Sequence, residues 1–211
     1  EARNSLSPQR VATPVTPALK ITDERQEQIL AAASRLIATK GVDAVTMAQL
    51  AAETGLSRPA IYQYFASKDH VLAELVINEM ADLSNAIERH IEGLADPLER
   101  VRIWVHYSLA HLASAEHRII REISIQSLPE ESRGMINAMH GHFMVALLSP
   151  LRELSVKDTT ATAHLIFASV AAAAKRIDEG SEFVREAAAL EQFTVAGLAA
   201  SAGASANSFD I

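Results

Sequence analysis

Apolar side chains recur at three- and four-residue spacing along most of the chain, which indicates helices rather than strands. The first such run predicts a helix over about 23–39, whose inward face carries Ile29, Ala33, Leu36 and Ile37. Thr22 is expected to cap it, and Lys40 and Gly41 supply a basic last turn and a C-terminal glycine. Residues 1–20 lack this periodicity and hold three of the seven prolines, which predicts a disordered leader.

Two short helices separated by a glycine are expected next. Thr46 and Gln49 form the capping box of the first, and Gly55 supplies backbone freedom for a tight turn. Ser57 caps the second, with Pro59 in its first turn, where a missing amide hydrogen costs nothing. A helix, a glycine turn and a short helix form a helix-turn-helix, whose second helix can enter the major groove of DNA.

The second of these helices leaves polar and aromatic side chains facing outward. Ile61 and Phe65, four residues apart, share its inward face. The outward side chains are Arg58, Ala60, Tyr62, Gln63 and Tyr64. An arginine can donate two hydrogen bonds to a guanine, and tyrosine hydroxyls can reach phosphate oxygens. Composition alone leaves open an ordinary all-α protein in which these tyrosines are half-buried in the core.

The following helix is expected to begin at the Ser67 cap and to reach about His90, before Gly93. It carries Lys68 in its first turn, where a lysine is unfavourable for the helix dipole. The same position favours a phosphate group, which would also meet the free amides of that helix end. The Ser67 cap and Lys68 therefore favour DNA binding over an ordinary all-α protein.

The run TMAQLAAETGLSRPAIYQYFASKDHVL, residues 46–72, resembles the amino-terminal DNA-binding domain of the TetR family of bacterial transcriptional repressors. The resemblance covers about residues 23–83 and is carried by Gly55, Tyr62, Phe65 and the Ser67-Lys68 pair followed by an acidic residue and a leucine. It implies a homodimer whose two recognition helices enter successive major grooves of a palindromic operator. It also implies a small-molecule effector, of unknown identity, bound in a helical carboxy-terminal domain.

Site residues carried over from the resemblance fall into two groups. Phosphate contacts are implied for Thr46, Tyr62 and Lys68. Contacts to bases or backbone are implied for Ser57, Arg58, Pro59, Ala60, Gln63 and Tyr64. Met47 and Ala48 stand where the family often has an arginine or serine, which puts a base contact from that helix in question.

The remaining chain also has a helical pattern throughout. The expected helices are one opening at Pro97 after an Asp96 cap, one from Glu130 to about Leu148 that Pro150 bends or ends, and two over 158–177 and 182–200. The predicted fold class is therefore all-α. The resemblance implies a three-helix DNA-binding domain at 21–83 (motif 46–65) and a helical effector-binding and dimerisation domain at 91–211.

The helix over 158–177 is apolar on nearly every side, so it should be buried on nearly every side. Together with the alanine-rich helix over 182–200 it would form half of a four-helix dimer interface, as the resemblance also suggests. Interface positions are expected at Phe167, Ala168, Ala171, Ala172 and Val195. A buried monomer core is the alternative.

Six of the eight histidines lie between residues 106 and 164: His106, His111, His117, His140, His142 and His164. A metal site on one helix needs spacings of three or four, which no pair of them has, so neither a metal nor a cofactor is expected. Some of them should instead line an effector pocket, for which the candidates are Trp104, Tyr107, His111, His140, Phe143 and Phe167.

The net charge of −7 is unevenly distributed. Residues 20–70 hold six basic and six acidic side chains, whereas residues 71–211 carry a net charge of −8. A DNA-binding face needs a local basic footprint rather than a basic protein, so double-stranded DNA is not excluded as a partner.

Other classes of protein find little support. The chain has no cysteine, no glycine-rich phosphate loop and no G-x-S-x-G motif, which argues against an enzyme. Its longest uncharged runs contain histidine or proline, and its start lacks the apolar run of a signal peptide, so a cytoplasmic protein without a membrane span is expected. The alternative is a helical protein–protein adaptor, which would lack salt-sensitive binding to duplex DNA.

Overall fold

The structure, a computed structural model, describes residues 17–203, with side chains from Glu24 to Ala200. All regular elements in this part of the chain are helices, so the predicted all-α class is confirmed. They are α1 (Pro17–Lys40), η1 (Val42–Ala44), α2 (Met47–Thr54), α3 (Arg58–Tyr62), α4 (Lys68–Ile91), α5 (Pro97–Leu112), α6 (Ala115–Ile120), η2 (Ile125–Ser127), α7 (Glu130–Glu153), α8 (Thr159–Asp178) and α9 (Phe183–Gly203). None of the described helices is both long and apolar enough to cross a membrane.

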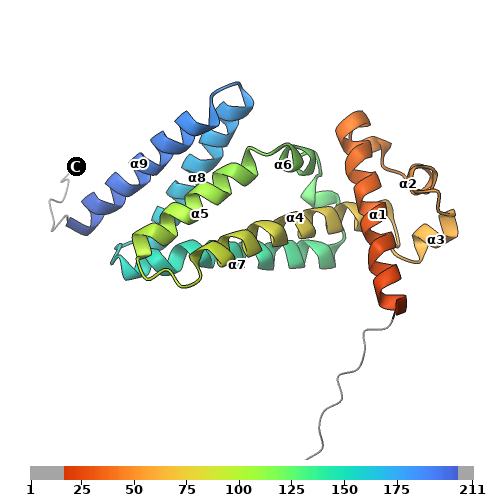
Figure 1. Cartoon of the computed structure of the whole chain (residues 1–211), viewed down its shortest axis with the longest axis horizontal. Coiled ribbons are helices and arrows are strands. Elements are labelled where there is room, and N and C mark those ends of the chain that lie inside the picture. The colour runs from red at the N-terminus through yellow and green to blue at the C-terminus, as the bar shows by residue number, and fades with distance from the viewer. Residues whose placement is uncertain (1–16, 204–211) are drawn as a thin grey trace, which may run out of the picture.

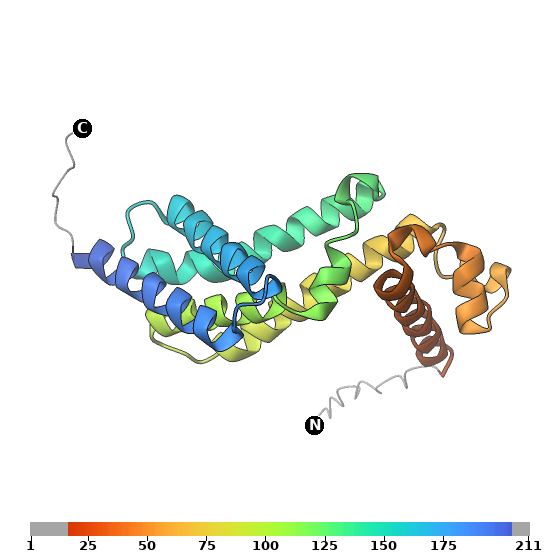
Figure 2. The same cartoon turned by 90° about the horizontal axis from the view of Figure 1, so that it is seen from above.

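Helix α4 links the two parts of an elongated molecule. Figure 1 shows α1, α2 and α3 gathered at one end, from which α4 runs into a larger bundle formed with α5, α7, α8 and α9. Helix α7 lies beside α4 along much of its length, and α8 and α9 pack as a pair at the far side of the bundle (Figures 1 and 2). Any movement of α4 relative to the bundle would therefore move the small helices at its start.

Two hydrophobic clusters stabilise the two parts. The first joins α1, α2, α3 and the start of α4, and also includes Ile123, Leu128 and Ile136 from the segment after α6 and from α7. The second fills the larger bundle around the fully buried Trp104. Since burial of apolar surface is the dominant favourable term in folding, the segment after α6 and the start of α7 are held against the small helices.

Most predicted helix starts are confirmed by their caps. The side chains of Thr46, Ser57, Ser67 and Asp96 each accept a hydrogen bond from a backbone amide in the first turn of α2, α3, α4 and α5. Gly93, with a φ of +77°, follows the end of α4.

Two predicted boundaries were wrong, and one α-helix and the two short 3-10 helices η1 and η2 were not predicted. Helix α1 begins at Pro17, so Thr22 lies inside it rather than capping it; proline is favoured at a first helical position. Residues 1–16 of the expected leader lie outside the described residues. Helix α7 continues through Pro150 to Glu153, because the buried Leu147 and Leu151 on either side hold it in the core. The unpredicted α-helix is α6, which Ser114 caps.

Candidate nucleic-acid interface and ligand cavity

The turn between α2 and α3 is built by two side-chain caps and one glycine. Thr46 Oγ1 accepts a hydrogen bond from the Gln49 amide at 3.1 Å, and Ser57 Oγ accepts one from the Ala60 amide at 3.2 Å. Between them Gly55 adopts a left-handed conformation with a φ of +70°, which a residue with a Cβ adopts only with strain. These three features fix the angle at which α3 leaves α2.

Helix α3 is oriented by the two apolar side chains that it buries. Ile61 is fully buried and Phe65 is 5% exposed. Of the nine side chains predicted to contact DNA, six are exposed: Thr46, Ser57, Arg58, Pro59, Tyr62 and Gln63. Ala60, Tyr64 and Lys68 are half-buried, and Tyr64 packs against the first hydrophobic cluster. The alternative hypothesis, in which the tyrosines are half-buried in the core, is thus correct for Tyr64 but not for Tyr62, which is 49% exposed.

Two cations of this face, Arg58 and Lys68, have no acidic partner in the part of the chain that the structure describes. Lys68 occupies the first turn of α4, next to the Ser67 cap. Both side chains are therefore available to an external anion, and the positive end of the α4 dipole adds to the attraction.

A cavity of about 410 Å³ lies where the two hydrophobic clusters meet. Val76, Glu79, Met80 and Leu83 of α4 form one wall, and Phe143 and Phe167 close it on the side of the bundle. The lining is mainly apolar, with a few polar groups, and its volume lies in the range of small-molecule sites. One polar atom of the lining, the buried Ser108 Oγ, has no hydrogen-bond partner among the described residues.

The structure brings together four of the six predicted pocket residues. His111, His140, Phe143 and Phe167 line the cavity. Trp104 lies behind it, fully buried, with its ring centroid 4.7 Å from that of Phe143 and its indole N–H donating to the Phe143 carbonyl at 3.2 Å. Tyr107 is not among the lining residues and packs against His90 instead, at a centroid distance of 4.2 Å.

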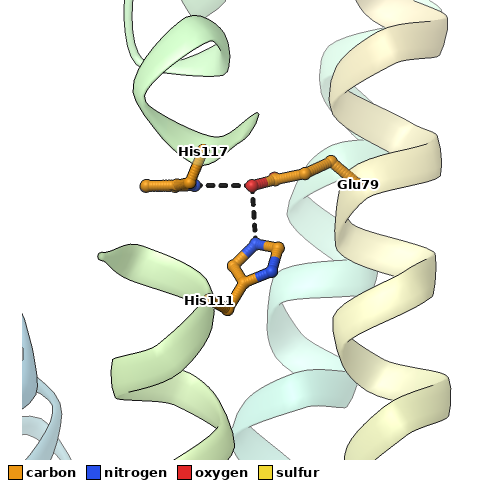
Figure 3. Close-up of side chains that lie close together, drawn as sticks. All are labelled: Glu79, His111 and His117. Carbon is orange, nitrogen blue, oxygen red and sulfur yellow. Dashed lines mark hydrogen bonds and ion pairs between the residues drawn. The ribbon is translucent and has the colours of Figure 1, made fainter. Parts of the chain in front are cut away.

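A polar cluster in the cavity wall was missed by sequence reasoning. Glu79 Oε1 lies 2.5 Å from His111 Nε2 and 2.6 Å from His117 Nδ1, as Figure 3 shows. Burial, the largest single influence, raises the pKa of Glu79, but hydrogen bonds from the two histidines and their charges together lower it to about 2. The three residues come from α4, α5 and α6, so a spacing rule for one helix could not find them. The available signal in the sequence was Ser114, which caps α6 and so places His117 on a separate helix.

Helices α8 and α9 carry an exposed apolar face. Leu165 and Phe193 are each 69% exposed, and Ala168, Ala171 and Ala172 are also exposed. Val195, predicted at an interface, is half-buried, and so is Phe167, which lines the cavity. The exposed apolar side chains at 165, 168 and 172 form one stripe along α8, because residues three, four and seven apart share a helix face.

Comparison with known proteins finds a family match in the first part of the chain. Residues 29–75 match the sequence model of the bacterial regulatory proteins of the tetR family. The HTH-type transcriptional regulator HbdR from Aromatoleum sp. (strain CIB) is 33% identical over 119 residues, which are 56% of this chain and 52% of HbdR. The chain thus aligns with about half the length of HbdR.

Two further similarities extend beyond the helix-turn-helix. The nucleoid occlusion factor SlmA from Vibrio campbellii is 30% identical over 142 residues, 66% of this chain and 72% of SlmA. The crystal structure of the transcriptional regulator FadR from Bacillus subtilis in complex with stearoyl-CoA has a TM-score of 0.67 and 21% identity, covering 81% of this chain and 98% of FadR. The latter similarity shows a shared fold.

Proposed function

Because the chain belongs to the TetR family of bacterial regulatory proteins, we propose that it is a cytoplasmic, ligand-responsive repressor. In this proposal a homodimer binds a palindromic operator and is released by a small apolar or amphipathic effector. The observation that carries the proposal is the course of α4. This helix begins with Lys68 at the proposed DNA face and lines the cavity with Val76, Glu79, Met80 and Leu83.

The proposed DNA contacts follow from the exposed face of the helix-turn-helix. Arg58 donates two hydrogen bonds to a guanine, while Ser57, Pro59, Ala60, Gln63 and Tyr64 adjoin bases or backbone. Thr46, Tyr62 and Lys68 contact phosphates. The exposure of Arg58, Tyr62 and Gln63 supports these roles, and so does the lack of an ion pair between Arg58 or Lys68 and any described carboxylate.

The proposed homodimer forms through α8 and α9. Each chain contributes these two helices to a four-helix interface that covers Leu165, Ala168, Ala171, Ala172 and Phe193. An exposed apolar patch of this kind is typical of an interaction surface, and the small alanine side chains allow close helix packing. Two recognition helices can enter successive major grooves when the dimer holds them roughly 34–36 Å apart.

The proposed effector occupies the cavity between the two clusters. Its apolar part packs on Leu83, Phe143 and Phe167, and a polar group meets Ser108 or the cluster around Glu79. The stearoyl-CoA complex of the structurally similar FadR supports an amphipathic effector. We keep the division into a DNA-binding domain at 21–83 and an effector domain at 91–211 as part of the proposal, with one change, because Val76, Glu79, Met80 and Leu83 also line the cavity.

Selection of bound duplexes tests the proposal. The purified protein is mixed with genomic fragments of its source organism, and the retained fragments are sequenced and then released with candidate small molecules. The proposal expects a palindromic motif, salt-sensitive binding and release by an amphipathic compound. Retention of no fragment would contradict it and favour a protein–protein adaptor.

A further inference from the structure

Three side chains from three separate helices converge on one point of the cavity wall. Glu79 lies on α4, His111 in the last turn of α5, and His117 on the short helix α6 (Figure 3). Their side chains are 12%, 17% and 16% exposed. A half-buried carboxylate is thus held by two imidazoles in a cavity that is otherwise mainly apolar.

The donor atoms have the composition of a metal site. One carboxylate oxygen and two imidazole nitrogens from these residues lie within 4.8 Å of one another. Two histidines and one glutamate are the protein ligands of some catalytic zinc sites, which keep a fourth position open, and the same donors also suit other divalent transition metals. An ordinary ion pair needs only one histidine for one carboxylate oxygen, whereas here two ring nitrogens share Glu79 Oε1.

The geometry requires only a small adjustment to accept an ion. In a tetrahedral zinc site with bonds of about 2.0–2.1 Å, neighbouring ligand atoms are roughly 3.3 Å apart. The two N···O distances of 2.5 and 2.6 Å would therefore lengthen by less than about 1 Å. Rotation of the Glu79 side chain can supply this lengthening, because its carboxylate is carried on a flexible stem. The two ring nitrogens already lie within 4.8 Å of each other and would approach by up to about 1.5 Å.

We propose that Glu79 Oε1, His111 Nε2 and His117 Nδ1 bind one divalent transition metal ion, Zn²⁺ in the first instance. The fourth coordination position faces the cavity that all three residues line. The ion joins α4 to the corner between α5 and α6. Ala113 and Ser114 form this corner, and His111 precedes it while His117 follows it in the chain. In addition, and resting on the proposed function, the open position takes an electron-pair donor from the effector, such as a carboxylate.

Zinc titration of the full chain tests the site without any operator or effector. Metal-free protein is titrated with Zn²⁺ by calorimetry, and its thermal unfolding is followed with and without the ion. The expected result is one ion per chain and a raised midpoint of unfolding, because an ion that binds only the folded state stabilises it. No stoichiometric binding by the wild-type protein would overturn the proposal.

Substitutions identify the ligands. Glu79→Gln keeps the size of the side chain and one acceptor oxygen but removes its charge, so the protein should fold and lose at least about 100-fold in zinc affinity, beyond the 10–100-fold effect typical of outer-shell changes. His111→Ala and His117→Ala should do the same. The matched control is His140→Ala, which alters another histidine of the same cavity and should leave zinc affinity unchanged.

Two results separate this inference from the proposed function. Equal zinc affinity in the wild type and in Glu79→Gln would overturn the site while leaving operator binding untouched. Loss of zinc binding in the three variants would support the site even for a chain that binds no operator. Replacement of Zn²⁺ by Co²⁺ adds a spectroscopic readout, since the visible absorption of Co²⁺ changes with its ligands and coordination number. A Co²⁺ spectrum that is the same in the wild type and in all three variants would contradict the three-ligand site.

Discussion

Arg58 and Lys68 are both cations without an acidic partner among the described residues, yet we expect them to act on different parts of a duplex. Arg58 lies on α3, whose exposed side faces away from the core, and its planar guanidinium matches the two acceptors of guanine. Lys68 lies at the start of α4, where a point charge and free amides suit a phosphate. Specificity and general affinity should therefore depend on different residues.

Arg58→Ala should weaken operator binding by roughly 1–3 kcal/mol and relax the preference at one base pair in each half-site, because a bidentate base contact is lost. Lys68→Ala should weaken binding to all duplexes about equally and reduce the salt slope by about 1. Fluorescence anisotropy with operator and scrambled duplexes measures both effects. Arg89→Ala, an exposed arginine near the far end of α4, serves as the control and should change neither. The same sequence-independent loss for Arg58→Ala and Lys68→Ala would refute base reading by Arg58.

Sequence reasoning at the residue scale was most successful where local chemistry decides. Ser57 and Ser67 were recognised as caps because a cap depends on a few neighbouring residues. Trp104 was expected in a cavity wall but lies behind it, since one-dimensional spacing gives the face of a helix and not the depth of a side chain. The Glu79 cluster depends on how three helices meet, which no local pattern encodes.

Helix boundaries were predictable to the extent that side chains mark them. The start of α5 carries the expected Asp96 cap and Pro97, and the predicted α8 and α9 differ from the structure by one to three residues at each end. Pro150 misled the prediction because its local cost is offset by tertiary packing of α7. Local signals therefore predict the order of the helices more accurately than their lengths.

Gly55→Ala should destabilise the fold by about 1–2 kcal/mol, because an alanine at this position must adopt a left-handed backbone conformation. Steric crowding is not the cause, since the space that the new Cβ would occupy is open. Urea unfolding monitored by circular dichroism measures the change in the free energy of unfolding. Gly141→Ala, in the exposed middle of α7, is the control and should instead stabilise by up to about 1 kcal/mol. Destabilisation of equal size in both variants would show that the turn geometry is not the cause.

At the scale of the whole molecule, α8 and α9 expose apolar side chains that nothing covers within the described part of a single chain. Leu165→Asp or Ala172→Glu should yield folded monomers, because a charge would be buried without a partner in the dimer but stays in water in the single chain. Light scattering measures the mass, and Ala138→Asp on exposed α7 is the control that should stay dimeric. An unchanged dimer mass in the folded Leu165→Asp and Ala172→Glu variants would move the interface elsewhere.

The central claim is that the cavity and the DNA-binding face are coupled through α4. A ligand can shift the protein away from its DNA-bound arrangement only by its difference in affinity for the two arrangements, and the operator must change ligand affinity by the same factor. Such coupling needs no contact between ligand and DNA, since Lys68 belongs to the same helix as the four wall residues Val76, Glu79, Met80 and Leu83.

The most direct measurement is a pair of calorimetric titrations with an amphipathic compound that raises the unfolding midpoint of the protein. One titration uses the free protein and the other uses the protein saturated with its selected operator. The account predicts weaker ligand binding in the presence of operator, by the same factor by which the ligand weakens operator binding. Equal ligand affinity in both titrations would contradict it and leave a DNA-binding protein whose larger bundle serves only to dimerise.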